Sequence, residues 1–139
     1  VREIILATNA TVAGQTTGAI ERGLVVLAAF ARGDTEAELA WMARKLPGLR
    51  IFPDTEDRMN RSLRDTGGGI LLVSQFTLYG DCRKGNRPSF NQAGEPAFAE
   101  QMCERFCAKL GEVLGRPVAT GRFAGNRWAG PAMRCRQPA

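Results

Sequence analysis

ILLVSQFTLY, residues 70–79, is the stretch that decides the fold of this chain. It begins with a continuous run of apolar side chains, a pattern typical of a strand that is buried on both faces. Its far end turns polar at Ser74, Gln75 and Thr77. The segment therefore predicts a buried strand whose last residues carry hydroxyl and amide groups out of the core.

Other segments have the pattern or the length of strands. Residues 2–13 alternate loosely and contain Ile, Val and Thr, and the apolar run 24–30 follows after a break at glycines, which predicts a hairpin and then a buried strand. LRIF at 49–52 and PVATGRF at 117–123 fit short strands. Residues 53–69 are polar, predict a loop or a hairpin, and end in three glycines. Because these glycines precede a strand instead of opening a helix, a turn is favoured over a phosphate-binding loop.

Two segments have helix patterns. Residues 34–46 (DTEAELAWMARKL) combine a capping box, Thr35 and Glu38, with apolar side chains on one helical face. Trp41 lies off that face, which is typical of an interface or packing residue. A longer helix is expected from about 95 to 114, with Phe98, Met102, Phe106, Leu110 and Val113 as its core positions. The order of strands, helix, strands, helix and strand predicts an α/β sandwich of layers and excludes a helix bundle.

Composition narrows the class of protein. The chain has 139 residues, the usual size of one domain, so we expect residues 1–139 to form a single domain. Hydrophobic residues at 44% and charged residues at 24% are typical of a soluble globular protein. No apolar stretch approaches the roughly 18 residues of a membrane span. The first residues, VREIILATNATV, have no pattern of a secretion signal, so we expect a cytoplasmic location and no membrane partner.

The sequence contains no histidine, which excludes Ser-His-Asp and Cys-His catalysis. Four cysteines show no CxxC pair, and we expect free buried thiols in place of disulfides. Cys103 and Cys107 lie four apart on the predicted second helix, where they would share a face. Because no histidine completes a ligand set, a zinc site is disfavoured and we expect no metal. The remaining cysteines are Cys82 and Cys135.

One group of neighbouring residues has polar and basic side chains suited to a functional site. Polar side chains end the strand at 70–79, and the basic loop GDCRKGNRPSFNQAG at 80–94 follows. The net charge of +5 favours a polyanionic partner, because lysine and arginine release counterions from phosphates. The alternative is that these polar groups only satisfy backbone partners where the strand leaves the core, and the residues alone leave both readings open. The candidate residues are Ser74, Gln75, Phe76 and Thr77 for a pocket and Arg83, Lys84 and Arg87 for phosphates.

SQFTLYGDCRKGNRPSF at 74–90 resembles the signature of the D-aminoacyl-tRNA deacylase family, once called D-tyrosyl-tRNA deacylases, whose usual run is SQFTLYADTRKGNRPSF. The resemblance continues over 18–46, over 49–63 and over TGRF at 120–123. It therefore covers nearly the whole chain from residue 1 to about 124, and a match of this length is highly specific.

The resemblance implies a layered α/β fold of two packed sheets with helices on one side, and a twofold homodimer. It implies an ester hydrolase that proofreads chirality in translation by removing D-amino acids from tRNA, and glycine mischarged on tRNA-Ala, without metal or organic cofactor. tRNA would then be the partner, and not DNA. Residues 74–77 would line the pocket for the terminal adenosine and its aminoacyl group, with backbone amides as an oxyanion hole. Because no base stands beside Thr77, a reaction assisted by the 2′-hydroxyl of the tRNA is favoured over a threonine nucleophile.

The C-terminal segment departs from the family. The family has an Asn-x-Gly-Pro motif, whose cis-proline enters the partner's pocket and excludes L-amino acids, and then a last strand. Residues 124–139 run AGNRWAGPAMRCRQPA instead, an atypical tail in which Gly130 and Pro131 are the sole candidate for the chiral gate. The alternative for this pair is a simple turn. Two other functions stay open, a non-enzymatic RNA-binding relative that lost the gate and an esterase of small molecules.

Overall fold

The computed structural model describes the backbone of residues 4–8 and all of residues 20–121. The atypical tail at 124–139, with Gly130 and Pro131, lies outside these residues.

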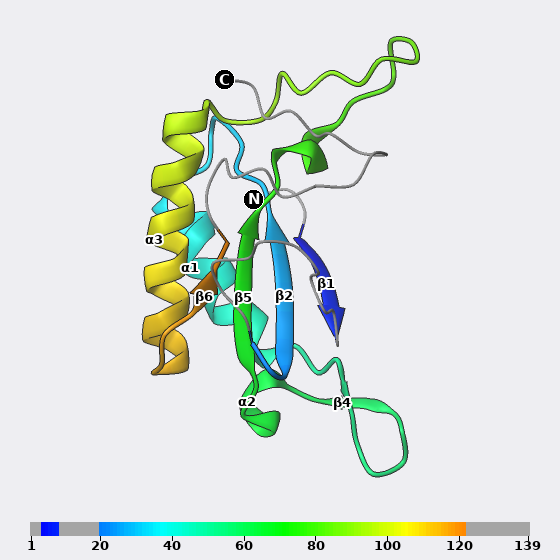
Figure 1. Ribbon diagram of the computed structural model, residues 1–139, viewed down its shortest axis with the longest axis vertical. Helices are drawn as coiled ribbons and strands as arrows, with labels where there is room; N and C mark the ends of the chain where they lie inside the picture. The colour runs from blue at the N-terminus through cyan, green and yellow to red at the C-terminus, as the bar shows by residue number, and fades with distance from the viewer. Residues whose placement is uncertain (1–3, 9–19, 122–139) are drawn as a thin grey trace.

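A four-stranded sheet forms the centre of the described chain (Figure 1). Its order is β1-β2-β5-β6, with β1 antiparallel to β2 and the other neighbours parallel. The register of β2 and β5 runs without a shift from Gly23 opposite Gly69 to Ala28 opposite Ser74, so both strands end at the same edge of the sheet. The strands are β1 (Ile4–Thr8), β2 (Gly23–Ala28), β5 (Gly69–Ser74) and β6 (Ala119–Thr120).

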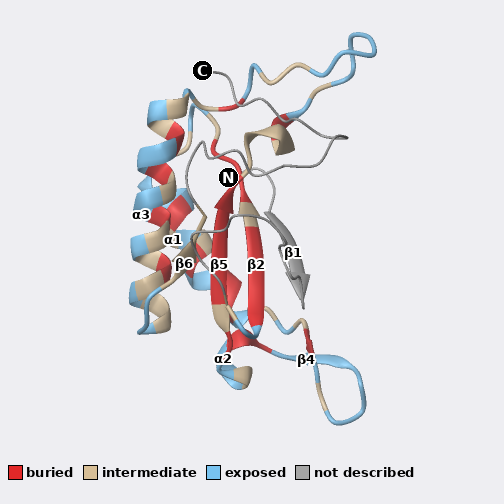
Figure 2. Cartoon of the chain, viewed as in Figure 1, coloured by how far each residue is buried: buried red, intermediate tan, exposed pale blue. Residues whose placement is uncertain are grey.

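The two central strands are buried on both faces, as their apolar sequences predict (Figure 2). Leu24 and Val26 of β2 point into the large core shared with the helices. Val25, Leu71 and Val73 point to the opposite face and form a second, smaller cluster. Alternate side chains of a strand point to opposite faces, so each strand contributes to both clusters.

Two helices, α1 (Glu36–Lys45) and α3 (Pro96–Leu114), cover one face of this sheet (Figure 1). The predicted capping box is present, since Ala37 N donates to Thr35 Oγ1 at 3.3 Å and Thr35 N donates to the Glu38 carboxylate at 2.6 Å. The predicted long helix is also confirmed. Met102, Phe106 and Leu110 are buried as predicted, whereas Phe98 and Val113 are only partly buried against the core. A single 3-10 turn, η1 (Leu46–Gly48), follows α1.

The polar segment between η1 and β5 forms a hairpin, one of the two predicted alternatives, and a short helix that the sequence does not predict. β3 (Phe52–Pro53) pairs with β4 (Met59–Arg61) in a two-stranded sheet. Of the strand predicted at 49–52, only Phe52 lies in β3. The short helix α2 (Leu63–Thr66) stands where the polar sequence predicts a loop. Ser62 and Asp65 form a capping box at its start, and Gly67 ends it with a φ of 68°. Four residues are too few to show a helical period, which explains the difference.

The predicted strand at 70–79 is also corrected. β5 ends at Ser74, and Phe76–Tyr79 form a 3-10 helix, η2. The reason is that only the apolar half of the segment fits between β2 and β6, after which the chain leaves the sheet.

Glycine is required where β2 and β5 begin. Gly23 has a φ of 144°, and a Cβ built there would lie only 1.9 Å from the Gly69 carbonyl oxygen. The Gly69 N–H donates to Arg22 O at 2.9 Å across the same approach. A side chain at Gly23 would force the two central strands apart.

The fold class is confirmed as α/β, with two sheets and with helices on one side of the larger sheet. Across residues 4–8 and 20–121, no helix has the length and apolar character that crossing a bilayer requires.

Candidate functional site

The predicted pocket residues lie together where β5 leaves the sheet. Ser74 is the last residue of the strand and is buried, while Gln75, Phe76 and Thr77 are half-buried. The Gln75 N–H donates to Ala28 O at 2.7 Å, which ties this exit to the end of β2. Because the carboxyl ends of parallel strands meet at one edge, this is the position where ligands bind in open α/β sheets.

Thr77 is held by an amide and not by a base. The Gln75 side-chain nitrogen donates a hydrogen bond to Thr77 Oγ1, and Thr77 O accepts from Gly80 N at 3.1 Å. An amide side chain does not remove a proton from a hydroxyl at neutral pH. The arrangement orients Thr77 without activating it as a nucleophile.

The N–H groups of Phe76 and Thr77 lie at the start of η2. The first N–H groups of a helix have no carbonyl partner within the helix. No residue of the described chain accepts a hydrogen bond from the N–H of Phe76 or of Thr77. Two adjacent amides without an acceptor in the described chain, at a strand exit, have the chemistry of an anion-binding or oxyanion-stabilising element.

An aromatic contact joins the pocket to the following loop. The rings of Phe76 and Phe90 meet edge to face, with centroids 5.2 Å apart and planes at 72°. Phe76 also packs on the cluster formed by Ala29, Tyr79 and Ala93. Sequence reasoning does not select Phe90, although it is the last residue of the signature run at 74–90.

The basic loop projects beyond the ends of the strands (Figure 1). Its stem is closed by two backbone hydrogen bonds between Asp81 and Ser89, of 2.8 and 2.9 Å. Arg83, Lys84 and Arg87 are exposed in the loop, so all three predicted cations face solvent next to the pocket segment.

The three cations differ in their partners. Asp81 binds the Arg83 guanidinium, with Nη2 to Oδ2 at 2.6 Å and Nε to Oδ1 at 2.9 Å, and this hydrogen bonding raises the pKa of Arg83. Neither Lys84 nor Arg87 forms an ion pair with any residue in the described ranges. Those two side chains are therefore the cations that are free to meet phosphates.

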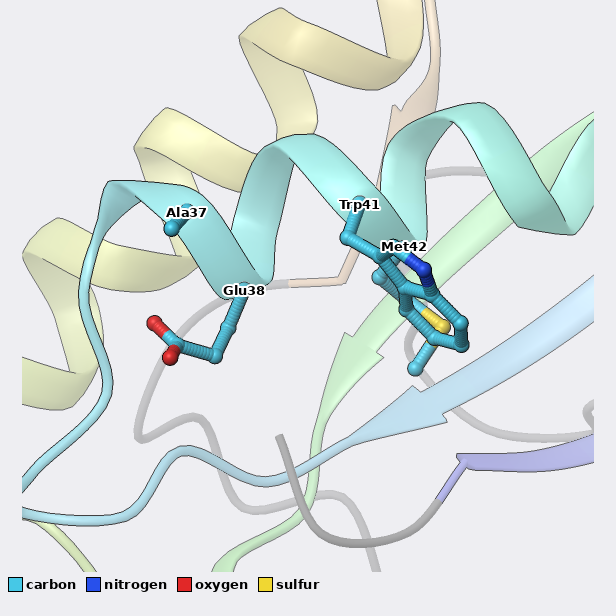
Figure 3. A pocket seen from close by; sticks show the side chains of 4 residues that line it. All are labelled: Ala37, Glu38, Trp41 and Met42. Atoms are coloured by element: carbon cyan, nitrogen blue, oxygen red, sulfur yellow. The ribbon is translucent and has the colours of Figure 1, made fainter.

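A hollow of about 260 Å³ lies elsewhere, on α1, and is lined by Ala37, Glu38, Trp41 and Met42 (Figure 3). The Glu38 carboxylate is already bound by Thr35, which lowers its pKa. Trp41 is 55% exposed, as its position off the apolar face predicts. This hollow contains none of the residues 74–77, 83, 84 and 87 that the sequence predicts for the site.

The three described cysteines form no disulfide, as predicted, but the expectation of buried thiols is corrected, since none of the three is fully buried. Cys103 and Cys107 are half-buried on α3, where burial raises the pKa of Cys107, and Cys82 is exposed because it lies in the basic loop. Within the described ranges, no group of three or more His, Cys, Asp or Glu side chains has the arrangement of a metal site.

Comparisons with known proteins give one result. Residues 4–128 match the family described as D-Tyr-tRNA(Tyr) deacylase. The chain is 49% identical over 118 residues to a D-aminoacyl-tRNA deacylase of Chlorobaculum parvum, covering 85% of this chain and 79% of the relative. It is 54% identical over 112 residues to the D-aminoacyl-tRNA deacylase of Acaryochloris marina, covering 81% and 74%.

Two solved structures are similar to the chain. The chain is similar to "c-Myc DNA Unwinding Element Binding Protein" with a TM-score of 0.72 and 34% identity, covering 86% of this chain and 78% of that one. It is also similar to a structure described as a probable eukaryotic D-amino acid tRNA deacylase, with a TM-score of 0.57 and 28% identity, covering 68% and 55%.

Proposed function

This chain belongs to the D-aminoacyl-tRNA deacylase family, and from that premise we infer that it hydrolyses the ester bond of D-aminoacyl-tRNA, releasing the D-amino acid and free tRNA. The observation that carries this inference is the match over residues 4–128, which includes the whole pocket segment and the basic loop. Because the relatives are named as enzymes, the reading as a non-enzymatic RNA-binding protein is not favoured.

We propose that residues 74–77 position the ester at the strand exit. A water molecule adds to the carbonyl carbon, and the N–H groups of Phe76 and Thr77 stabilise the oxyanion that forms. As it adds, the water gives a proton to the neighbouring 2′-hydroxyl, which passes its own proton to the 3′-oxygen as the bond from that oxygen to the carbonyl carbon breaks. The protein contributes orientation and electrostatics, which suits a site without histidine.

The proposed reaction also determines which nucleic acid is the partner. A step that uses the 2′-hydroxyl requires RNA, because DNA lacks this group. We propose that Lys84 and Arg87 contact the phosphates of tRNA next to its 3′ end, and that Arg83 contributes to tRNA binding through its pairing with Asp81. Glycine mischarged on tRNA-Ala is a second substrate in this proposal, since it has no side chain that a pocket for D-amino acids would reject.

We propose further that the protein is a cytoplasmic homodimer, because its substrate serves translation and because the family completes its pocket across a twofold interface. Gly130 and Pro131 are the sole candidate for the chiral gate in that arrangement. Light scattering at micromolar concentration tests the dimer, and a particle of one chain only would contradict it.

The function is tested by incubating purified protein with D-Tyr-tRNA and measuring the D-tyrosine that is released. Release at a rate well above the spontaneous one supports the deacylase. Binding of tRNA without release would favour the RNA-binding alternative. D-tyrosine methyl ester is the matched control, because hydrolysis of this ester at a similar rate would point to an esterase of small molecules.

A further inference from the structure

Asp81 is the residue that joins the pocket segment to the basic loop. Its Oδ1 accepts hydrogen bonds from Arg83 N and Arg83 Nε, each at 2.9 Å, and its Oδ2 accepts from Arg83 Nη2 at 2.6 Å. Its backbone pairs with Ser89 on the returning side of the loop. One residue therefore fixes the start of the loop through its side chain and closes the stem through its main chain.

We propose that Asp81 is a positioning residue for the binding of tRNA. By binding Arg83, the Asp81 carboxylate holds the basic loop in one conformation. The loop then presents Lys84 and Arg87 to the phosphates of the tRNA. This proposal rests on the proposed function, since it concerns how the deacylase holds its substrate.

The geometry of the clasp favours a fixed loop. A carboxylate that accepts from the backbone N–H two residues later forms an Asx turn, and the bidentate contact with the guanidinium adds orientation to that turn. Gly85, at a φ of 99°, makes the bend between Lys84 and Arg87. A loop that is ordered before binding loses less conformational entropy when it binds.

The negative charge of Asp81 does not by itself favour the binding of phosphate. A carboxylate in a loop that meets RNA repels phosphate, and it also offsets the charge of Arg83. The Arg83 side chain is 77% exposed, and ion pairs between exposed groups add little to folding stability. Electrostatics alone therefore predicts tighter tRNA binding when Asp81 is neutralised, whereas the clasp predicts weaker binding.

Asp81→Asn separates the two effects, because asparagine has nearly the same shape and raises the net charge by one. We expect KM for D-Tyr-tRNA to rise about fivefold, the equivalent of roughly 1 kcal/mol, with kcat within about twofold of wild type. Glu95→Gln is the matched control, since it removes the carboxylate of another exposed pair, with Arg32 at 3.3 Å, and lies outside the loop. We expect an unchanged or lower KM for this control.

A double-mutant cycle adds a readout that a general structural effect would not produce. Asp81→Asn, Arg83→Gln and the double variant should raise KM by similar factors, because each breaks the same clasp. Additive effects would mean that Arg83 meets a phosphate independently of Asp81 and would overturn the proposal. A lower KM for Asp81→Asn, as in the control, would overturn it as well.

The Kd for uncharged tRNA is measured on the same preparations. A wild-type protein that binds tRNA without turnover contradicts the proposed function alone, and the order of Kd values among the variants still decides whether Asp81 acts as a clasp.

Discussion

The Gln75 side-chain amide donates its hydrogen bond to Thr77 Oγ1 at the point where the central strand gives way to η2. Since an amide is no base, Thr77 is oriented and not activated. We expect Thr77→Ala to keep at least about a tenth of the wild-type kcat, because removing a true nucleophile costs roughly 10⁴-fold or more. Release of D-tyrosine under single-turnover conditions measures this. An inactive Thr77→Ala protein with an unchanged circular dichroism spectrum would show that the hydroxyl takes part in the chemistry.

The substrate's own hydroxyl is expected to matter more than that of Thr77. A tRNA that ends in 2′-deoxyadenosine still carries the amino acid on its 3′-oxygen but lacks the neighbouring proton donor and acceptor. We expect its hydrolysis to slow by roughly 10²- to 10⁴-fold, the usual contribution of general acid–base catalysis. Equal rates for the two tRNAs, at equal Kd, would reject assistance by the 2′-hydroxyl.

Lys84 and Arg87 are expected to set the salt dependence of tRNA binding. Each phosphate contact contributes about 0.7 to 0.9 to the slope of log K against log salt concentration. Replacing either residue by alanine should therefore flatten the slope by roughly that amount, as measured by filter binding between low and physiological salt. Arg58→Ala is the control, because Arg58 pairs with Glu56 in the β3–β4 hairpin, at the other end of the sheet from the basic loop (Figure 1). A slope that changes only in the control would place tRNA on that other end.

Local signals in the sequence explain which elements are predictable. Thr35 and Glu38 indicate α1 because a capping box lies within four residues of sequence. Ser62 and Asp65 have the same spacing before α2, but the polar residues and glycines around them favour a loop. The parallel pairing of β2 with β5 depends on contacts between distant residues, which no local period encodes.

The residues of the candidate site can be predicted from the sequence, but their arrangement in space cannot. Residues 74–77 and the three cations follow from the strand's polar end and the signature run. The contact of Phe90 with Phe76 needs the loop to return on itself, which the Asp81 to Ser89 pairing brings about. The clasp of Arg83 by Asp81 is local, yet a D-x-R spacing is too common to be specific.

Gly23→Ala is expected to be strongly destabilising. The new Cβ would lie 1.9 Å from the Gly69 carbonyl oxygen, at a φ of 144° that side chains rarely adopt. Strain of about 1–3 kcal/mol and overpacking of similar size together predict a loss of roughly 2–6 kcal/mol in the free energy of unfolding. Urea denaturation followed by circular dichroism measures it. Gly33→Ala is the control, because a Cβ at Gly33 would meet no atom within 4 Å, and equal stabilities of the two variants would contradict the close approach of β2 and β5.

The atypical tail at residues 124–139 bears on chiral selectivity, the preference for D- over L-aminoacyl-tRNA. In the family, a rigid glycine-proline backbone stands against the α-carbon of the substrate, where an L side chain would collide. Gly130-Pro131 is the only Gly-Pro pair in this chain, and the Ala132-Met133 that follows it differs from the usual Val-Thr-like continuation.

We expect that Gly130-Pro131 does not restore a full gate, because a cis X-Pro bond is uncommon and must be held in place by its surroundings. Measurable hydrolysis of L-Tyr-tRNA is the predicted result, and it is measured beside D-Tyr-tRNA and glycyl-tRNA on one preparation, with spontaneous hydrolysis subtracted. Pro131→Ala should then leave the ratio of D to L rates unchanged. Rapid turnover of the D substrate with clean rejection of the L substrate, lost in Pro131→Ala, would show instead that this pair still excludes L-amino acids.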